Sequence, residues 1–257
     1  MREYIHGDLD PNEVARLEFQ APFVASFALK GLSVGPDDRV LDLGCGVGAM
    51  TAQLATLFPD IALFAVDIEL APLRVAQANH PVAVFIQANG ARLPFKDKTF
   101  DCVHSSWLLE HVPSPVTVLQ EVRRVLRPQG ECQFLEVDNS SWRTEPEYPE
   151  IVEVIRAINQ TQIASGSDPY IGRRLETLLK CAGFSRQHVS PVHLRGDVSN
   201  PTAFSMTHIL ADIIESVDQA LGPTMMLTVR AAAARLRAMN IDQNAISFCP
   251  VLGRAIR

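Results

Sequence analysis

The apolar positions of this 257-residue chain change their spacing repeatedly along the sequence, and these changes predict alternating strands and helices. Between residues 11 and 32 they recur at helical spacing, and the pair Asp10-Pro11 is a good helix start. From residue 39 onward, short apolar runs typical of buried strands alternate with helical segments. The strands are expected at 39–43, 61–66, 82–87, 100–105 and 131–137, and the helices at 48–57, 71–79 and 116–126. This alternation predicts a parallel, doubly wound sheet with helices on both faces.

The regularity loosens after residue 138, where additional helices interrupt the pattern. Helices are expected at 149–165, 171–182, 201–221 and 224–239, and two further strands at 186–194 and 245–252. The predicted fold class is α/β, with a mostly parallel, Rossmann-like seven-stranded sheet, an N-terminal helix and a helical cap insertion. We expect a single domain over 1–257, composed of an N-terminal helical lid at 1–35, a ligand-binding core at 38–138 and cap segments at 139–183 and 197–240.

The composition narrows the class of function. Hydrophobic residues make up 47% of the chain, enough for a buried core, but no apolar stretch has the length of a membrane helix. The net charge of −6 gives no general attraction to nucleic acid. The five cysteines are scattered without metal-ligand spacing, and the polar N-terminus does not resemble a signal peptide. We therefore expect a reduced, cytoplasmic protein with no metal site.

The strongest chemical signal is an apolar strand that runs into three glycines at alternate positions, Gly44, Gly46 and Gly48. Glycine tolerates positive φ and lets a ligand approach the backbone, and the N-terminus of the following helix favours an electron-rich group. Gly44, Gly46 and Ala49 fit the dinucleotide-binding fingerprint, with Asp67 about 20 residues further on. The alternative is an ordinary strand-to-helix turn that binds no ligand, because short glycine motifs also arise by chance.

Asp42 separates two nucleotide-binding interpretations of this loop, since a dinucleotide strand usually enters its turn through apolar residues. The segment 42–48, Asp-Leu-Gly-Cys-Gly-Val-Gly, resembles motif I of the class I S-adenosylmethionine (AdoMet) methyltransferases, D-x-G-x-G-x-G. The resemblance implies that Asp42 helps to hold the methionine ammonium of the cofactor, directly or through water. It also implies cofactor contacts at Gly44, Cys45 and Gly46.

Two further segments resemble cofactor-binding motifs of the same family. Asp67 and Ile68 follow the second strand, and the resemblance implies that Asp67 accepts hydrogen bonds from both ribose hydroxyls. A cap for the next helix is the structural alternative for Asp67. Residues 87–95 resemble the adenine-side loop, although the family usually has Asp where this chain has Asn89. The implied contacts in this loop are Asn89, Gly90 and Ala91.

The resemblance continues through the fourth and fifth strands. Residues 100–112 resemble the fourth motif, which places Ser105 near the methionine end and Trp107 near the adenine or the pocket wall. Residues 125–131 match the usual turn into the fifth strand. Together the motifs cover about 38–138, and their combination is far more specific than any one of them.

The N-terminal stretch carries a narrower resemblance. Residues 4–7, 16–17 and 20–21 are similar to small-molecule methyltransferases whose leading helix lies over the cofactor. This similarity implies that Tyr4 and Gln20 touch AdoMet. A surface helix with an exposed tyrosine is the alternative.

The expected activity is transfer of a methyl group from AdoMet to an O, N or C atom of a small organic molecule by in-line displacement. Such an enzyme mainly aligns the reactants and excludes water, and a general base helps if the acceptor is a hydroxyl or an acidic carbon. The candidate bases are His111, Asp138 and His193, with Glu136 and His6 as further candidates. The candidate pocket residues are Trp142, Tyr148, Tyr170 and Arg173.

Two other classes of function stay open at this level. A protein- or RNA-modifying methyltransferase needs an open, charged groove, and a non-catalytic AdoMet-binding regulatory module lacks an acceptor cavity. The expected partner is a small-molecule methyl acceptor rather than nucleic acid or a membrane. The sequence leaves open the identity of the acceptor, the atom methylated and the oligomeric state, a homodimer included.

Overall fold

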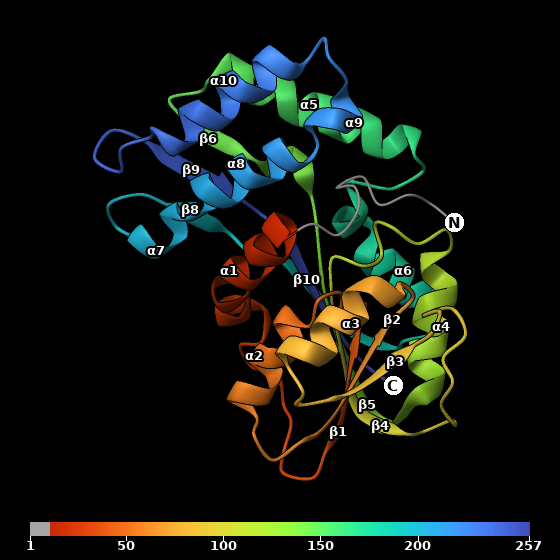
Figure 1. Cartoon of the computed structure of the whole chain (residues 1–257). Helices are drawn as coiled ribbons and strands as arrows, with labels where there is room; N and C mark the ends of the chain where they lie inside the picture. Colours follow the sequence, from red (N-terminus) through yellow and green to blue (C-terminus); the bar gives the residue numbers. More distant parts are fainter. Residues whose placement is uncertain (1–10) are drawn as a thin grey trace.

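The computed structural model describes residues 11–257 and contains a large sheet flanked by helices, with a second, smaller sheet beyond one end of it (Figure 1). The large sheet has seven strands in the order β3-β2-β1-β4-β5-β10-β7. They are β1 (Arg39–Leu43), β2 (Ala62–Asp67), β3 (Val84–Gln87), β4 (Phe100–Ser106), β5 (Leu126–Glu136), β7 (Arg186–Pro191) and β10 (Val251–Ile256). β10 runs antiparallel to its neighbours β5 and β7, and the other strands of this sheet share one direction. The predicted α/β, mostly parallel seven-stranded sheet is confirmed.

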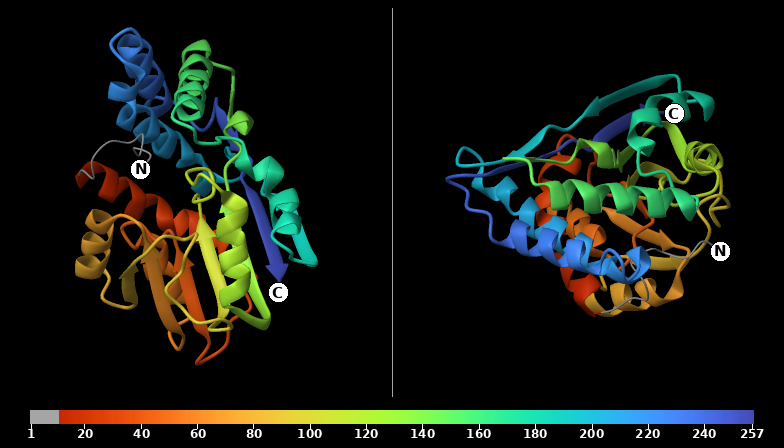
Figure 2. Two further views of the ribbon diagram at one scale, coloured as in Figure 1. Left: turned by 90° about the vertical axis from the view of Figure 1, so that its right-hand side faces the viewer. Right: turned by 90° about the horizontal axis from the view of Figure 1, so that it is seen from above.

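Helices cover both faces of this sheet (Figure 2). They are α1 (Pro11–Ala28), α2 (Ala49–Leu57), α3 (Leu70–Asn79), α4 (Pro115–Val125) and α6 (Leu175–Cys181). Neighbouring residues of β1 show the two faces, because side chains alternate along a strand. Val40 packs with α1 and α2 through Ala25 and Leu54, whereas Leu41 belongs to the cluster that includes Val118 of α4. Burial on both faces explains why these strands are continuous apolar runs.

A cap lies beyond the carboxyl ends of the parallel strands (Figure 1). Its three-stranded antiparallel sheet has the order β6-β9-β8. The strands are β6 (Arg143–Glu145), β8 (Leu194–Gly196) and β9 (Ala245–Phe248), and the helices are α5 (Pro149–Ala164), α7 (Pro201–Phe204), α8 (Met206–Ser216), α9 (Asp218–Leu221) and α10 (Met226–Arg237). Helix α10 packs against both α5 and α8, and α1 contacts α8 from below. None of the described helices is long and apolar enough to cross a membrane.

The cap sheet continues three edge strands of the core past a break. β6 follows β5, β8 follows β7 and β9 precedes β10, so the order β5-β10-β7 is repeated as β6-β9-β8. At the break, the Val192 N–H donates to the carbonyl of Pro250 at 2.8 Å. The Cys249 N–H donates to the Ser141 hydroxyl at 2.9 Å. We call this region, residues 137–142, 192–193 and 249–250, the waist.

The structure corrects several predicted elements. The expected strands 186–194 and 245–252 are each two strands, one in the core and one in the cap. Pro250 interrupts the second run because proline has no N–H for the ladder, but the apolar pattern continues across it. The expected helix 201–221 is three short helices. The expected helix 171–182 begins as the 3-10 turn η2 (Ile171–Arg174) and continues as α6.

The position of helix α6 differs from the predicted division of the chain into core and cap segments. The helix packs against α4, β7 and β10 of the core, whereas the expected cap segment 139–183 included it. The cap is therefore smaller on this side than expected. The other boundaries of that division stay a prediction.

Candidate functional site

The glycine turn after β1 has three residues with positive φ: 75° at Gly44, 52° at Gly46 and 81° at Gly48. The Gly44 N–H donates to the carbonyl of Val66 at 2.7 Å, which holds the turn against β2. A Cβ added at Gly48 would lie 2.9 Å from the Cβ of Ala76, so this glycine allows α3 to pack closely. A Cβ at Gly46 would meet no atom of the described residues 11–257 within 4 Å. The turn therefore borders open space at Gly46.

Asp67 borders the same space from the end of β2. One carboxylate oxygen accepts the Gly46 N–H at 2.8 Å, and the other accepts the Glu69 N–H at 2.9 Å. Burial raises the pKa of Asp67, although these backbone hydrogen bonds oppose the shift. Asp67 thus supports the start of α3 and keeps a second lone pair on each oxygen for a ligand. Ile68 follows with half of its surface exposed.

Asp42 and Cys45 lie deeper in the same turn. Asp42 is 2% exposed and accepts the Thr51 hydroxyl at 2.6 Å. Burial raises the pKa of Asp42 to about 7. The Cys45 side chain packs with Ala65 and Leu73, and its backbone N–H donates to the carbonyl of Val66 at 3.0 Å. The turn therefore lies over a buried carboxyl group, which suits a cationic ligand group.

The loop after β3 is held by its own backbone contacts. The amide oxygen of Asn89 accepts the Ala91 N–H at 2.8 Å, an Asx turn. A Cβ added at Gly90 would lie 3.5 Å from Leu43 of β1, so the loop passes close to the strand that carries the glycine turn. Asn89 is exposed and keeps one lone pair on its oxygen and both amide hydrogens for other partners.

The end of β4 and the residue that follows it lie next to the glycine turn. Ser105 is buried and donates its hydroxyl to the Leu43 carbonyl at 2.7 Å, which ties β4 to β1. Trp107 has a φ of 56°, and its backbone N–H donates to the carbonyl of Leu135 at 2.8 Å. Its indole packs with Val24 of α1. The buried indole N–H has no hydrogen-bond partner among residues 11–257, so it is a candidate ligand contact.

Helix α1 lies against the glycine turn through Ala21, which packs with Val47. Gln20 is 5% exposed, and its amide oxygen accepts from the guanidinium of Arg16 at 3.0 Å. The same guanidinium binds both oxygens of Glu13, at 2.6 and 2.8 Å. The structure therefore places Gln20 in a buried polar network on the helix that covers the turn. Tyr4 and His6 lie outside the described residues.

The candidate base His111 lies in the loop that follows β4. Its Nε2 is 3.6 Å from a carboxylate oxygen of Glu110, which is 5% exposed. Burial raises the pKa of Glu110 well above its ordinary value. Glu136, at the end of β5, accepts the Leu109 N–H at 3.0 Å, and burial raises the pKa of Glu136 to about 8. Glu136 therefore anchors the loop that carries His111.

The other two candidate bases lie at the waist. Asp138 accepts the Ser140 hydroxyl at 2.7 Å and the Nε of Arg173 at 2.8 Å. His193 is exposed, with Nδ1 3.3 Å from the Sγ of Cys249. The fold thus brings Asp138 and His193 to one junction and leaves His111 on the core loop. Their catalytic roles stay predictions.

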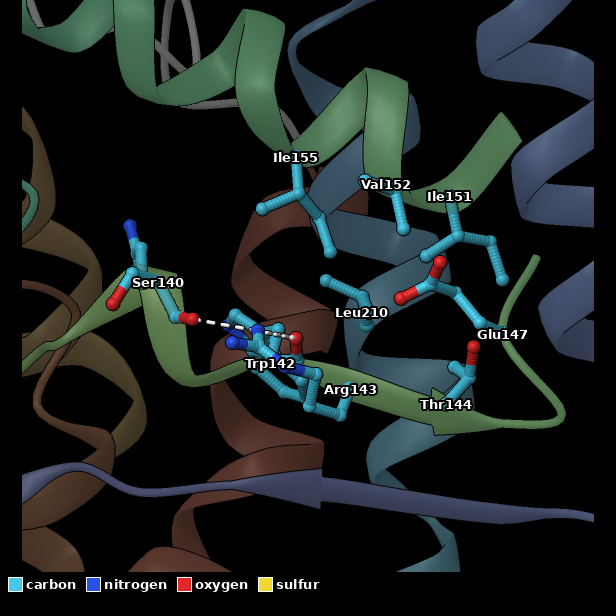
Figure 3. Close-up of a pocket in the computed structure, with 10 residues that line it drawn as sticks. Ser140, Trp142, Arg143, Thr144, Glu147, Ile151, Val152, Ile155 and Leu210 are labelled. Carbon is cyan, nitrogen blue, oxygen red and sulfur yellow. Dashed lines mark hydrogen bonds between the residues drawn. The ribbon is translucent and has the colours of Figure 1, made fainter. Parts of the chain in front are cut away.

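A cavity of about 280 Å³ lies between β6 and α5 (Figure 3). Its lining residues are Asn139, Ser140, Trp142, Arg143, Thr144, Glu147, Ile151, Val152, Ile155 and Leu210. The Trp142 indole is stacked on Phe248 of β9 at 4.2 Å, which fixes its orientation. We call this space, between the end of β5 and the first turns of α5, the cap cavity.

The sequence predicted Trp142 in this pocket but missed Arg143 and the α5 residues. The spacing of Ile151, Val152 and Ile155 along one side of a helix was the available signal. The aromatic candidates Tyr148 and Tyr170 do not line the cap cavity. The Tyr148 hydroxyl donates to Asn244 at 2.6 Å, and the Tyr170 ring packs under a guanidinium. Arg173, the guanidinium concerned, does not line it either.

The comparisons with known proteins decide between the two nucleotide-binding interpretations. Residues 41–134 match the family model described as a methyltransferase domain. This chain carries a class I AdoMet-dependent methyltransferase domain. Its cofactor is AdoMet, and the dinucleotide interpretation is thereby set aside. The described residues fit this cofactor, because the carboxylate of Asp67 lies beside Gly46, where the turn leaves open space among them.

Three similar proteins illustrate the range of the match. Methyltransferase str2 of Strobilurus tenacellus is 28% identical over 194 residues, which cover 72% of this chain and 67% of that protein. Demethylmenaquinone methyltransferase of Streptomyces avermitilis is 34% identical over 115 residues, 44% of this chain and 48% of that protein. The match thus spans about half to two thirds of these relatives.

The third similar protein is a solved structure. Geranyl diphosphate C-methyltransferase of Streptomyces coelicolor superposes with a TM-score of 0.55 at 15% identity, covering 93% of this chain and 78% of that one. At this identity the likeness shows a shared fold.

Proposed function

We propose that this protein transfers a methyl group from AdoMet to an O, N or C atom of a small organic molecule held in the cap cavity. The observation that carries the proposal is the position of this cavity. Asn139 and Ser140 line it only three and four residues after β5 ends, at the sheet edge that also bears Asp67. Ligands of open α/β sheets bind at this carboxyl edge, which supports an acceptor site in the cap cavity.

In the proposed mechanism, the residues of this chain align the two reactants and form no covalent bond with them. AdoMet, when bound, supplies a methyl group on a positively charged sulfur. Asp67 and the glycine turn hold the donor side, while Trp142 and Ile155 enclose the acceptor. Enclosure removes water and fixes the approach of the acceptor in line with the sulfur–carbon bond, which accounts for much of the rate gain in such displacements.

The names of similar proteins support a small-molecule acceptor. Demethylmenaquinone and geranyl diphosphate are small organic molecules, and the proteins named for their methylation share sequence or fold with this chain. The chain's net charge of −6 disfavours an RNA as the acceptor, and a cavity of about 280 Å³ suits a small molecule better than a protein segment. All five cysteines are free thiols, which supports the proposed cytoplasmic location.

The test has two stages and uses the full chain. Calorimetry with AdoMet comes first, and no binding at millimolar cofactor would exclude the donor assignment. A turnover screen over phenols, amines and carboxylic acids follows, with S-adenosylhomocysteine release and the methylated product measured by mass spectrometry. Methylation of at least one class is expected. AdoMet binding without turnover of any acceptor would favour the alternative, a non-catalytic regulatory module.

A further inference from the structure

The cap cavity has a polar inner end and, beyond it, an aliphatic wall supplied by α5 and α8 (Figure 3). The inner end, next to β5, carries Asn139, Ser140 and Arg143. Thr144 lies at the opposite end, and Glu147 directs its carboxylate toward the middle of the cavity. Beyond the inner end, α5 and α8 supply only aliphatic side chains: Ile151, Val152, Ile155 and Leu210. An occupant that matches this lining has an apolar body and a polar group at the inner end.

Arg143 is the positively charged residue among those that line the cavity, and two backbone carbonyls hold its guanidinium. Its Nη1 donates to the carbonyls of Ser140 and Trp142, each at 2.7 Å. Among the side chains that the structure describes, no carboxylate forms an ion pair with it, and the nearby acids Asp138 and Glu145 pair with other arginines. The neighbouring acids have other cations, because Arg173 pairs with Asp138. The remaining N–H groups of Arg143 are therefore available to an anion in the cavity.

The acids beyond the inner end are likewise committed elsewhere. Both oxygens of Glu145 accept from Arg195, at 2.8 and 2.9 Å. Glu147 also lines the cavity, and Figure 3 shows its carboxylate directed toward Val152 and Leu210 rather than toward Ser140. The inner end thus combines one fixed cation with two neutral polar residues.

Among the candidate bases that the structure describes, none lines the cavity. His111 lies beside Glu110 in the core loop, and Asp138 and His193 make their contacts at the waist. The inner end therefore offers a cation that stabilises an ionised oxygen, instead of a base that removes a proton from a neutral hydroxyl. A fixed positive charge lowers the pKa of an acidic group bound against it.

Resting on the proposed function, we propose that the methyl acceptor is an acidic organic molecule, of the phenol, enol or carboxylic acid class, whose ionised oxygen lies against Arg143. A lone pair of that oxygen forms the new bond to the methyl carbon, while the carbon–sulfur bond breaks and its electron pair stays on sulfur. Anion and sulfonium become a neutral ether or ester and S-adenosylhomocysteine. The step balances without a general base, an oxidant or a further reactant.

The test compares acceptors that differ in acidity but share a shape. Aromatic carboxylic acids are paired with their primary amides, and ring-substituted phenols span pKa values from about 7 to 10. With the wild-type chain, turnover of the acids and of the more acidic phenols is expected to exceed that of the amides and of matched amines. For the phenols, the kcat/KM should rise with pH at a value below the pKa of the free phenol, because Arg143 favours the anion.

The variant Arg143→Gln should lower kcat/KM for the acidic acceptors at least tenfold and move the rise of the phenol profile to higher pH. Arg143→Lys, which keeps the charge, should recover part of the loss. Arg156→Gln is the matched control, since this arginine is exposed on α5 and does not line the cavity. It should match the wild type, and AdoMet affinity should be unchanged in all three variants.

Two results separate failure of this inference from failure of the proposed function. Equal turnover of amines or neutral alcohols by the wild type, or unchanged acid turnover in Arg143→Gln, overturns the acidic acceptor and leaves small-molecule methyl transfer in place. Absence of turnover with every acceptor, despite AdoMet binding, overturns both. Circular dichroism of Arg143→Gln establishes that the variant is folded before either result is interpreted.

Discussion

The cofactor region and the cap cavity are built in different ways. The cofactor region is assembled from short contiguous segments, such as the glycine turn from Gly44 to Gly48 and the residue pair Asp67-Ile68. The cap cavity joins residues far apart in the sequence, including Trp142 and Leu210, and is braced by Phe248. A local motif can therefore identify the donor, whereas the acceptor site depends on how distant segments pack.

The two regions also differ in how they carry charge. The core buries acidic groups, and burial raises the pKa values of Asp42 and Glu136 to about 7 and 8. The cap carries its charges in exposed ion pairs, such as that between Arg195 and Glu145. Exposed pairs contribute little to stability, whereas a buried acid couples stability to pH. The pH dependence of stability should accordingly originate in the core.

The largest expected effect is a loss of AdoMet affinity from a substitution in the cofactor region that leaves the cap unchanged. Asp67→Ala removes the proposed ribose acceptor and the partner of the Gly46 N–H. Each hydrogen bond to a charged group is worth roughly 1.5–3 kcal/mol, so the Kd for AdoMet should rise about 100-fold or more. Calorimetry measures this, with Asp67→Asn as an intermediate case. Unchanged affinity would show that the ribose assignment is wrong.

The next effect tests the buried charge of the core. Glu136 has a pKa raised by burial from 4.5 to about 8, so between these values the native state holds a proton that the unfolded chain has lost. Stability should therefore fall as pH rises from about 5 to 8. Glu136→Gln should reduce this pH-dependent loss in the free energy of unfolding by on the order of 2–4 kcal/mol. Urea unfolding across this range measures it.

The matched control for this experiment is Glu145→Gln, which removes an exposed acid of the cap. It should leave the slope of stability against pH above 5 close to that of the wild type. The same slope in Glu136→Gln and in the wild type would contradict the assignment of this dependence to Glu136. The glutamine can still accept the Leu109 N–H, which favours a folded variant.

A smaller effect tests the cap cavity alone. Ile155→Gln puts a polar group into the aliphatic wall and should raise the KM for the acceptor roughly tenfold, since desolvating an amide costs about 1–3 kcal/mol. AdoMet affinity should not change. Ile163→Gln is the control, because Ile163 lies on the same helix and is 52% exposed. An equal rise in both variants would show that the cavity does not hold the acceptor.

The smallest effect concerns the departure from the family at the adenine-side loop. Asn89→Asp should strengthen AdoMet binding roughly threefold, because a charged acceptor forms stronger hydrogen bonds than an amide. It should also keep the turn to the Ala91 N–H, whereas Asn89→Ala loses that turn. Calorimetry compares the three forms. Weaker binding by Asn89→Asp would place the adenine amino group away from this side chain.

The sequence predicted the architecture of the core because its signals are local. Strands buried on both faces appear as apolar runs, and the turn at Gly44, Gly46 and Gly48 requires backbone conformations that glycine adopts readily. The same signals wrongly predicted single strands at 186–194 and 245–252, because in each case one apolar run continues from one sheet to the other. Apolar periodicity reports burial, but it does not report which strand is the partner.

The candidate bases show that the sequence cannot predict the surroundings of a single titratable residue. His111, Asp138 and His193 have no spacing that relates them, so the sequence offers each only as an isolated titratable group. The tertiary structure gives each a partner, respectively Glu110, Arg173 and Cys249, and places none of them in the cap cavity.

By itself, the sequence determined the fold class, the glycine turn and the family that the turn belongs to, because backbone conformation and burial in contiguous segments are written in residue type and spacing. Only the tertiary structure decided where an acceptor fits. The cap cavity exists because edge strands of the core continue as a second sheet beyond the waist and carry Trp142 and Arg143 under α5. That arrangement depends on packing between distant segments, and no local pattern records it.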